Sequence, residues 1–168
     1  MKTLTSIVLL SLSLGVFADE NDNLPNVLSY DAWLSSDNRL KCMYGYFAGK
    51  TGDHDSAKII YEDCIRRWDD VYSMIGLAHI YENGNGVPVD FKRATDLMRR
   101  GANTRDEAGY SSLARYHYGV ALFEGKGVDR NLTESRYWLQ LALNEGVSDA
   151  ARYLEQFPDP DSHVSGTD

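Results

Sequence analysis

The sequence predicts an all-α protein, a short α/α solenoid in which helical hairpins stack side by side and a final helix caps the stack. Two observations carry this prediction. Residues 82–94, ENGNGVPVDFKRA, return in similar form at an offset of 41 residues as residues 123–135, FEGKGVDRNLTES. Apolar residues also recur at helical spacing on both sides of these segments. A repeated unit of two helices around a turn is typical of a solenoid.

Each repeated unit is predicted to contain a first helix, a glycine turn and a second helix. Glycine tolerates the positive φ of a helix exit, so the glycine pairs are expected to end the first helices. Asp90 in the middle unit, and Asn131 or Thr133 in the last unit, are expected to cap the second helices. The predicted turn residues are Gly84, Gly86 and Val87 in the middle unit and Gly125, Gly127 and Val128 in the last unit.

The repeated segment resembles the Sel1-like repeat, a relative of the tetratricopeptide repeat. Two features depart from that pattern. The offset exceeds the usual period of the family, which implies an insertion near residues 104–109, and Ser135 stands where alanine is usual. The match in the middle unit comprises Leu77, Tyr81, Gly84, Gly86, Val87, Asp90, Ala94, Gly101 and Ala102, and in the last unit Gly119, Gly125, Gly127, Val128, Trp138, Ala142 and Gly146.

A degenerate unit is expected upstream. The close-packing site of its first helix is predicted at Tyr44 and Gly45. Its second helix is predicted to contain Ala57, Ile60, Tyr61 and Cys64. The turn at 49–55 is shorter than the turns of the other two units. The predicted domain organisation is a signal peptide at 1–18, an N-terminal extension with a short helix at 19–38, a Sel1-like repeat domain at 39–157, and a disordered tail at 158–168. Within the repeat domain the units are expected at about 39–69, 70–106 and 108–146, with a cap at 147–157.

Residues 1–18 have the basic start, apolar core and small final residue of a secretory signal. The alternative is a short membrane anchor, but the apolar run is well below the ~20 residues that a span needs. Export, with the periplasm of a Gram-negative cell as the expected location, would place Cys42 and Cys64 in an oxidising compartment. The pairing of two helices about a turn near residues 51–54 sets Cys42 opposite residues 61–65, so the sequence predicts a disulfide; two buried thiols are the alternative.

The chain of 168 residues carries a formal net charge of −8. This balance argues against nucleic acid and against anionic lipid headgroups as partners, because both are bound through Lys and Arg. No membrane span is expected elsewhere in the chain.

No catalytic or metal-binding motif is visible around the four histidines, His54, His79, His117 and His163. The prediction is therefore a protein that is not an enzyme and that needs no cofactor and no metal. Asn131-Leu132-Thr133 matches a glycosylation acceptor, but a helix cap is the favoured interpretation of Asn131.

The remaining candidate for function is a surface. In tetratricopeptide-like solenoids the first helix of each unit lines the concave face, and tyrosine and arginine suit a binding surface. The alternative for Tyr72 and Tyr116 is packing between repeats. The expected partner-binding residues are Arg39, Tyr46 and Lys50 in the first unit, Tyr72, His79, Glu82 and Asn83 in the second, and Tyr116, Phe123 and Glu124 in the third.

The resemblance implies a protein-binding module that is a monomer when free. Two roles are considered for an exported member: an immunity protein that neutralises a secreted toxic effector, and an adaptor or regulator of an envelope assembly or signalling complex. A cell-envelope hydrolase is the alternative from a different class.

Overall fold

The computed structural model describes residues 30–157, and every regular element in that range is an α-helix. The prediction of an all-α solenoid is confirmed. The expected signal peptide, most of the N-terminal extension and the expected tail lie outside the described residues. The helices are α1 (Asp31–Leu34), α2 (Lys41–Thr51), α3 (His54–Trp68), α4 (Val71–Asn83), α5 (Phe91–Asn103), α6 (Tyr110–Glu124), α7 (Leu132–Asn144) and α8 (Ala150–Leu154).

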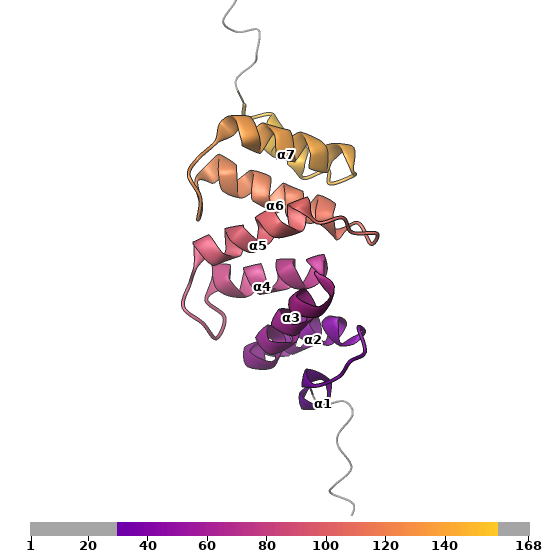
Figure 1. Ribbon diagram of the computed structural model, residues 1–168. Helices are drawn as coiled ribbons and strands as arrows, with labels where there is room; N and C mark the ends of the chain where they lie inside the picture. Colours follow the sequence, from indigo (N-terminus) through magenta and orange to yellow (C-terminus); the bar gives the residue numbers. More distant parts are fainter. Residues whose placement is uncertain (1–29, 158–168) are drawn as a thin grey trace, which may run out of the picture.

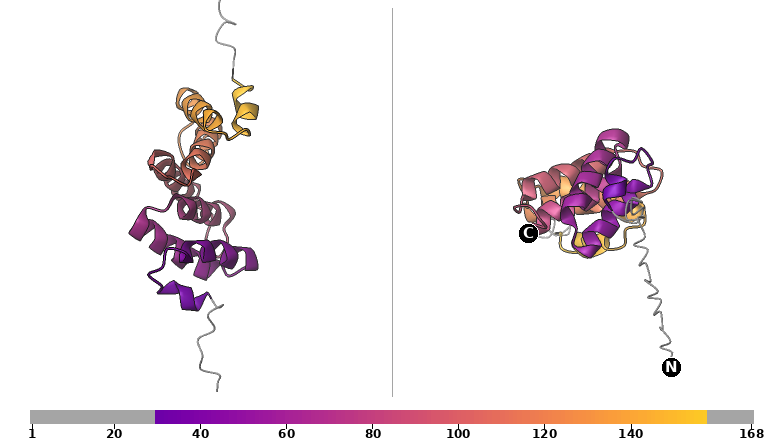
Figure 2. Two further views of the ribbon diagram at one scale, coloured as in Figure 1. Left: turned by 90° about the vertical axis from the view of Figure 1, so that its right-hand side faces the viewer. Right: turned by 90° about the horizontal axis from the view of Figure 1, so that it is seen from below.

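Three helical hairpins, α2–α3, α4–α5 and α6–α7, stack in chain order along one axis (Figure 1). The short helix α1 packs on the first hairpin, and α8 packs on α7 at the other end of the stack (Figure 2). Helix α8 packs on α7 as α6 packs on α5. It therefore covers the last hairpin in the way that the first helix of a further unit would. Such a cap removes the apolar end of a solenoid from water.

Side-chain caps fix where the helices begin. Asp53, Asp70, Asp90 and Asn131 each accept a hydrogen bond from the backbone N–H three residues further on, at the starts of α3, α4, α5 and α7. The Asn131 bond, from the Glu134 N–H to Oδ1, is 3.1 Å long. Asn131 therefore acts as a helix cap, as the sequence predicted, and satisfies a donor that the helix itself leaves unpaired.

The second glycine of each turn lies against the preceding unit. A Cβ atom on Gly127 would lie 2.1 Å from the carbonyl oxygen of Phe91, at the start of α5. The same turn accepts a hydrogen bond of 2.8 Å from the Thr95 hydroxyl to the Lys126 carbonyl oxygen. In the turn before it, a Cβ on Gly86 would lie 3.2 Å from the Cβ of His54, at the start of α3. The glycine turns are thus contacts between repeats as well as connections within them.

One tyrosine joins the first two hairpins. The buried ring of Tyr61 on α3 lies so close to α2 and α4 that Cβ atoms on Gly45 and Gly76 would be 2.6 and 2.4 Å from it. Glycine at both positions is what allows the ring to fit between the two helices. Gly45 therefore has the close-packing role that the sequence predicted, and the group packed against it is the ring of Tyr61.

The first hairpin has no glycine-valine turn and is held together differently. Cys42 on α2 and Cys64 on α3 form a disulfide with a Cα–Cα distance of 6.0 Å, as predicted. Next to it, the fully buried ammonium of Lys41 forms an ion pair with Asp63 and donates a hydrogen bond of 3.4 Å to the Leu34 carbonyl oxygen. The covalent bond and the ion pair both connect α2 to α3.

Reducing the disulfide is expected to lower the free energy of unfolding by about 3 kcal/mol, because the bond closes a loop with a sequence separation of 22 residues. Urea denaturation of the oxidised protein and of the Cys42→Ala/Cys64→Ala variant, followed by circular dichroism, measures the difference. Equal midpoints for the two proteins would contradict the expectation.

Candidate protein-binding groove

A groove runs along the face formed by the first helices of the first two hairpins. Two surface cavities make it up, of about 1170 Å³ and about 510 Å³. Tyr46 on α2 and Tyr72 on α4 line both cavities, so these two tyrosines mark the place where the cavities meet.

The α2 wall of the groove is apolar and exposed. Leu40, Met43 and Phe47 lie at positions i, i+3 and i+7 and line the larger cavity, and their side chains are 57%, 53% and 47% exposed. Tyr46 on the same helix is 43% exposed, and the Lys50 ammonium lies 5.4 Å from the centre of its ring. On the opposite face of α2, Cys42, Gly45 and Ala48 are buried.

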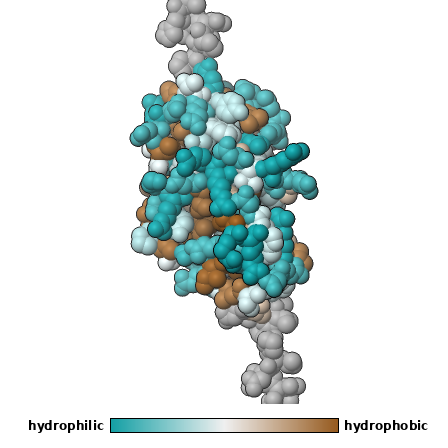
Figure 3. All heavy atoms as spheres, in the orientation of Figure 1, coloured by the Kyte–Doolittle hydropathy of each residue, from teal (hydrophilic) through white to brown (hydrophobic). Residues whose placement is uncertain are grey.

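The sequence interpretation included Arg39 and Tyr46 but missed Leu40, Met43 and Phe47. A signal for them was present, because α2 carries large apolar residues in addition to the small residues Cys42, Gly45 and Ala48 of its buried face, whereas a surface helix needs only one apolar face to pack on its own protein. Figure 3 shows apolar residues breaking the polar surface over α4 and the α2–α3 hairpin.

The middle of the groove contains an ion pair that also fixes a helix start. Arg39 donates to Asp70 Oδ1 at 3.2 Å. The other oxygen of Asp70 accepts from the backbone N–H of Ser73 at 2.9 Å and from its hydroxyl at 2.7 Å. Asp70 is therefore fully engaged by the protein itself and leaves little capacity for a partner.

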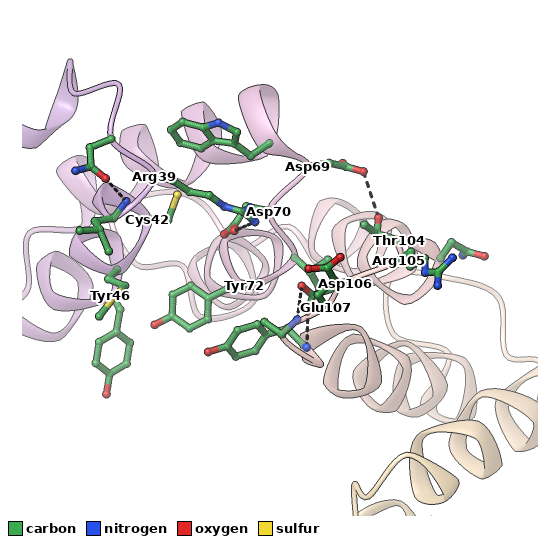
Figure 4. A pocket seen from close by; sticks show the side chains of 18 of the residues that line it. Arg39, Cys42, Tyr46, Asp69, Asp70, Tyr72, Thr104, Arg105, Asp106 and Glu107 are labelled. Atoms are coloured by element: carbon green, nitrogen blue, oxygen red, sulfur yellow. Dashed lines mark hydrogen bonds and ion pairs between the residues drawn. The ribbon is translucent and has the colours of Figure 1, made fainter.

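The far end of the larger cavity is formed by the loop between α5 and α6, which corresponds to the predicted insertion. Asp106 accepts hydrogen bonds from the backbone N–H groups of Ala108 and Tyr110, at 3.2 and 2.6 Å. Within residues 30–157, neither Asp106 nor Glu107 forms an ion pair. In Figure 4 both lie between Tyr72 and Arg105, and the Arg105 side chain points away from the tyrosines.

Tyr72 combines packing and exposure. Its ring centre lies 5.1 Å from that of Tyr110 and 6.5 Å from that of Tyr61. Burial, followed by the neighbouring Tyr110, raises the pKa of Tyr72 to about 12. The hydroxyl therefore stays protonated at neutral pH and remains a hydrogen-bond donor at the junction of the two cavities. Tyr72 therefore packs against neighbouring tyrosines and also lines the groove, so each of the two interpretations made from the sequence applies to it.

The smaller cavity is lined by three further residues predicted for the groove, Lys50, His79 and Asn83. Glu82 does not line either cavity. Its carboxylate lies 3.6 Å from the ammonium of Lys126, in the glycine turn of the next hairpin, so the structure gives it a contact between repeats.

The predicted residues of the third unit lie elsewhere. Tyr116 and Phe123 pack against Tyr153 of α8, with ring centres 6.1 and 5.6 Å apart, and the Tyr153 hydroxyl donates to Glu124 at 3.3 Å. Neither cavity includes these residues: Tyr116 and Phe123 are half-buried beside α8, and Glu124 is exposed. The packing interpretation of Tyr116 is the one that describes its position.

His79 and His117 come together from α4 and α6, with ring centres 5.3 Å apart. Burial, with a smaller contribution from His79, lowers the pKa of His117 to about 4.

In the described part of the chain, no cluster of three or more His, Cys, Asp or Glu side chains could hold a metal ion. No helix among those residues is long and apolar enough to span a membrane.

Acid is expected to destabilise the protein through His117. Unfolding restores the usual histidine pKa of about 6.5, so between that value and about 4 the unfolded chain binds a proton that the folded protein does not. The free energy of unfolding should therefore fall as the pH is lowered through this range, by up to about 3 kcal/mol. Urea denaturation at several pH values tests this, and a His117→Gln variant should lose less stability over the same range. Identical pH dependence in both proteins would count against the assignment.

Helical hairpins stacked through glycine turns define the class of this protein, a tetratricopeptide-like α-solenoid. The family model of the Sel1 repeat matches residues 71–103, which contain the α4–α5 hairpin, and residues 112–147, which contain all but the start of the α6–α7 hairpin. These two parts of the chain are therefore Sel1 repeats. No curated protein and no solved structure gives a significant match. Sel1 repeats are protein–protein interaction modules and are typically non-catalytic.

Proposed function

We propose that this Sel1-like protein is a non-catalytic binding module that recognises another protein through the groove between α2, α4 and the α5–α6 loop. The observation that carries the proposal is the cluster of exposed apolar and aromatic side chains along the α2 wall, including Met43, Tyr46 and Phe47. Large exposed apolar clusters mark interaction sites, and aromatic residues contribute most of the binding energy at such sites.

The proposed setting is the periplasm, and the proposed role is that of an immunity protein that neutralises a secreted toxic effector. The disulfide between Cys42 and Cys64 supports an oxidising compartment. The acidic net charge of −8, together with the groove that the described residues form, suits recognition of a single partner protein.

A pull-down of the oxidised protein from the periplasm and secreted fraction of its own organism tests the proposal. A Tyr46→Ala/Phe47→Ala variant removes two exposed side chains of the groove. Tyr137→Ala is the matched control, because Tyr137 on α7 is 60% exposed and lines neither cavity. One partner that is captured by the wild type and the control but not by the groove variant is expected.

The identity of the captured partner then distinguishes the immunity role from the adaptor role. A partner whose toxicity is relieved by co-expression of this protein supports the immunity assignment, whereas an envelope protein would replace it with an adaptor role. A partner retained by the groove variant would overturn the groove as the binding site. Substrate turnover by the purified protein would overturn the non-catalytic assignment in favour of a hydrolase.

A further inference from the structure

We propose that the groove binds a segment of a second protein that presents large apolar side chains together with lysine or arginine. This inference rests on the proposed binding function and adds the chemistry of the partner. Its two parts come from opposite ends of the larger cavity, the α2 wall and the α5–α6 loop.

The apolar part follows from the stripe formed by Leu40, Met43 and Phe47. Met43 and Phe47 lie on one face of α2 and Leu40 is the residue just before the helix, and about half of each residue is exposed to water. Burying such a stripe against apolar side chains is favourable roughly in proportion to the area removed from water. The partner is therefore expected to present an apolar surface of its own at this wall.

The basic part follows from the two carboxylates on the loop. Asp106 binds only backbone N–H groups, and Glu107, which is exposed, makes no hydrogen bond or ion pair within the described residues 30–157. The cations nearest to them in the lining are engaged or directed elsewhere: Arg39 pairs with Asp70, and Arg105 points away from the tyrosines (Figure 4). A lysine or arginine that enters this end of the groove would therefore meet carboxylates that have no cationic partner.

Charge also separates this occupant from two others. A second copy of the chain has a net charge of −8 and would bring further acidic surface towards Asp106 and Glu107. An anionic membrane surface would be repelled for the same reason. A basic and apolar protein segment satisfies both ends of the cavity, and its on-rate would be raised by electrostatic attraction.

Selection of random peptides on the purified oxidised protein tests the proposal. We expect the enriched peptides to combine large apolar residues with lysine or arginine and to contain few acidic residues. Fluorescence anisotropy with one enriched peptide should show that Phe47→Ala and Glu107→Lys each weaken binding by at least about tenfold. Selection on the Glu107→Lys variant should enrich acidic peptides instead.

Two variants serve as matched controls. Tyr137→Ala removes an exposed aromatic side chain outside the groove, and Asp129→Lys makes the same change of charge as Glu107→Lys in the exposed turn between α6 and α7. Both controls should bind the peptide as the wild type does, and circular dichroism should show all four variants folded.

Several results would overturn the proposal. They are an absence of enrichment, enriched peptides without basic residues, and equal losses in the groove and control variants. A dimer broken by Phe47→Ala would identify a second copy as the occupant, and vesicle binding lost in that variant would identify a membrane. A natural partner lost from the Tyr46→Ala/Phe47→Ala pull-down would preserve the proposed function even where the peptides show no preference for basic residues.

Discussion

Replacing Gly127 with alanine is expected to lower the free energy of unfolding by about 3 kcal/mol or more. Two costs add at this position. The backbone has φ of +71°, a left-handed conformation that is unfavourable for residues with a side chain. The new Cβ would also lie 2.1 Å from the carbonyl oxygen of Phe91, which belongs to the backbone of α5 and cannot rotate away. The turn must therefore move off the preceding hairpin.

A Gly109→Ala variant isolates the first of these costs. Gly109 has φ of +81° and nothing within 4 Å of its would-be Cβ, so only the backbone penalty of about 1 kcal/mol is expected there. Denaturant unfolding of both variants by circular dichroism measures the difference. Similar losses at the two positions would mean that the contact with Phe91 contributes little, and the role of the turn as a contact between repeats would have to be abandoned.

Replacing Asp63 with alanine is expected to cost about 3 kcal/mol of stability, because it leaves the fully buried ammonium of Lys41 without its carboxylate. Burial by itself would raise the pKa of Asp63, but hydrogen bonds from Lys41 and Arg67 outweigh burial and lower the pKa below its usual value. Since the folded-state pKa is depressed, the contribution is present above about pH 4 and is lost as the pH falls below that value.

Asp96→Ala on α5 is the matched control for Asp63→Ala. Asp96 pairs with Lys92 at 2.8 Å and with Arg99 at 3.0 Å, but these cations are 78% and 59% exposed. Exposed ion pairs contribute little, so the control should lose less than about 1 kcal/mol. Urea denaturation at neutral pH compares the two variants. Equal losses would show that the burial of Lys41 does not make its ion pair important.

The scaffold could be predicted from sequence because its determinants are local. A glycine with positive φ, a capping Asp90 or Asn131 and apolar residues at helical spacing each act within a few positions of the chain. The disulfide could also be predicted from the sequence, because antiparallel helices around a short turn place Cys42 opposite Cys64. The contact of Gly127 with Phe91 was not, since it depends on how one hairpin sits on the next.

The groove was only partly predictable, for the same reason. Residues of α2 and α4 could be assigned to it from the family geometry, and Arg39, Tyr46, Tyr72, His79 and Asn83 do line the cavities. No local sequence pattern predicted the direction of α8, whose Tyr153 packs against Tyr116 and Phe123 of the third unit. The contribution of the α5–α6 loop was missed because an insertion has no counterpart in the repeat pattern.

The position of the disulfide affects the stability of the hairpin that forms the α2 wall of the groove. The stability of a repeat array is approximately a sum of terms for each unit and each boundary, so its parts can open separately. The hairpin that carries the apolar wall has no glycine-valine turn and is held by Cys42–Cys64 instead. Reduction of the disulfide would thus be expected to destabilise the end of the stack at which the proposed groove lies. Forming the disulfide would then stabilise the hairpin that carries the α2 wall of the proposed groove.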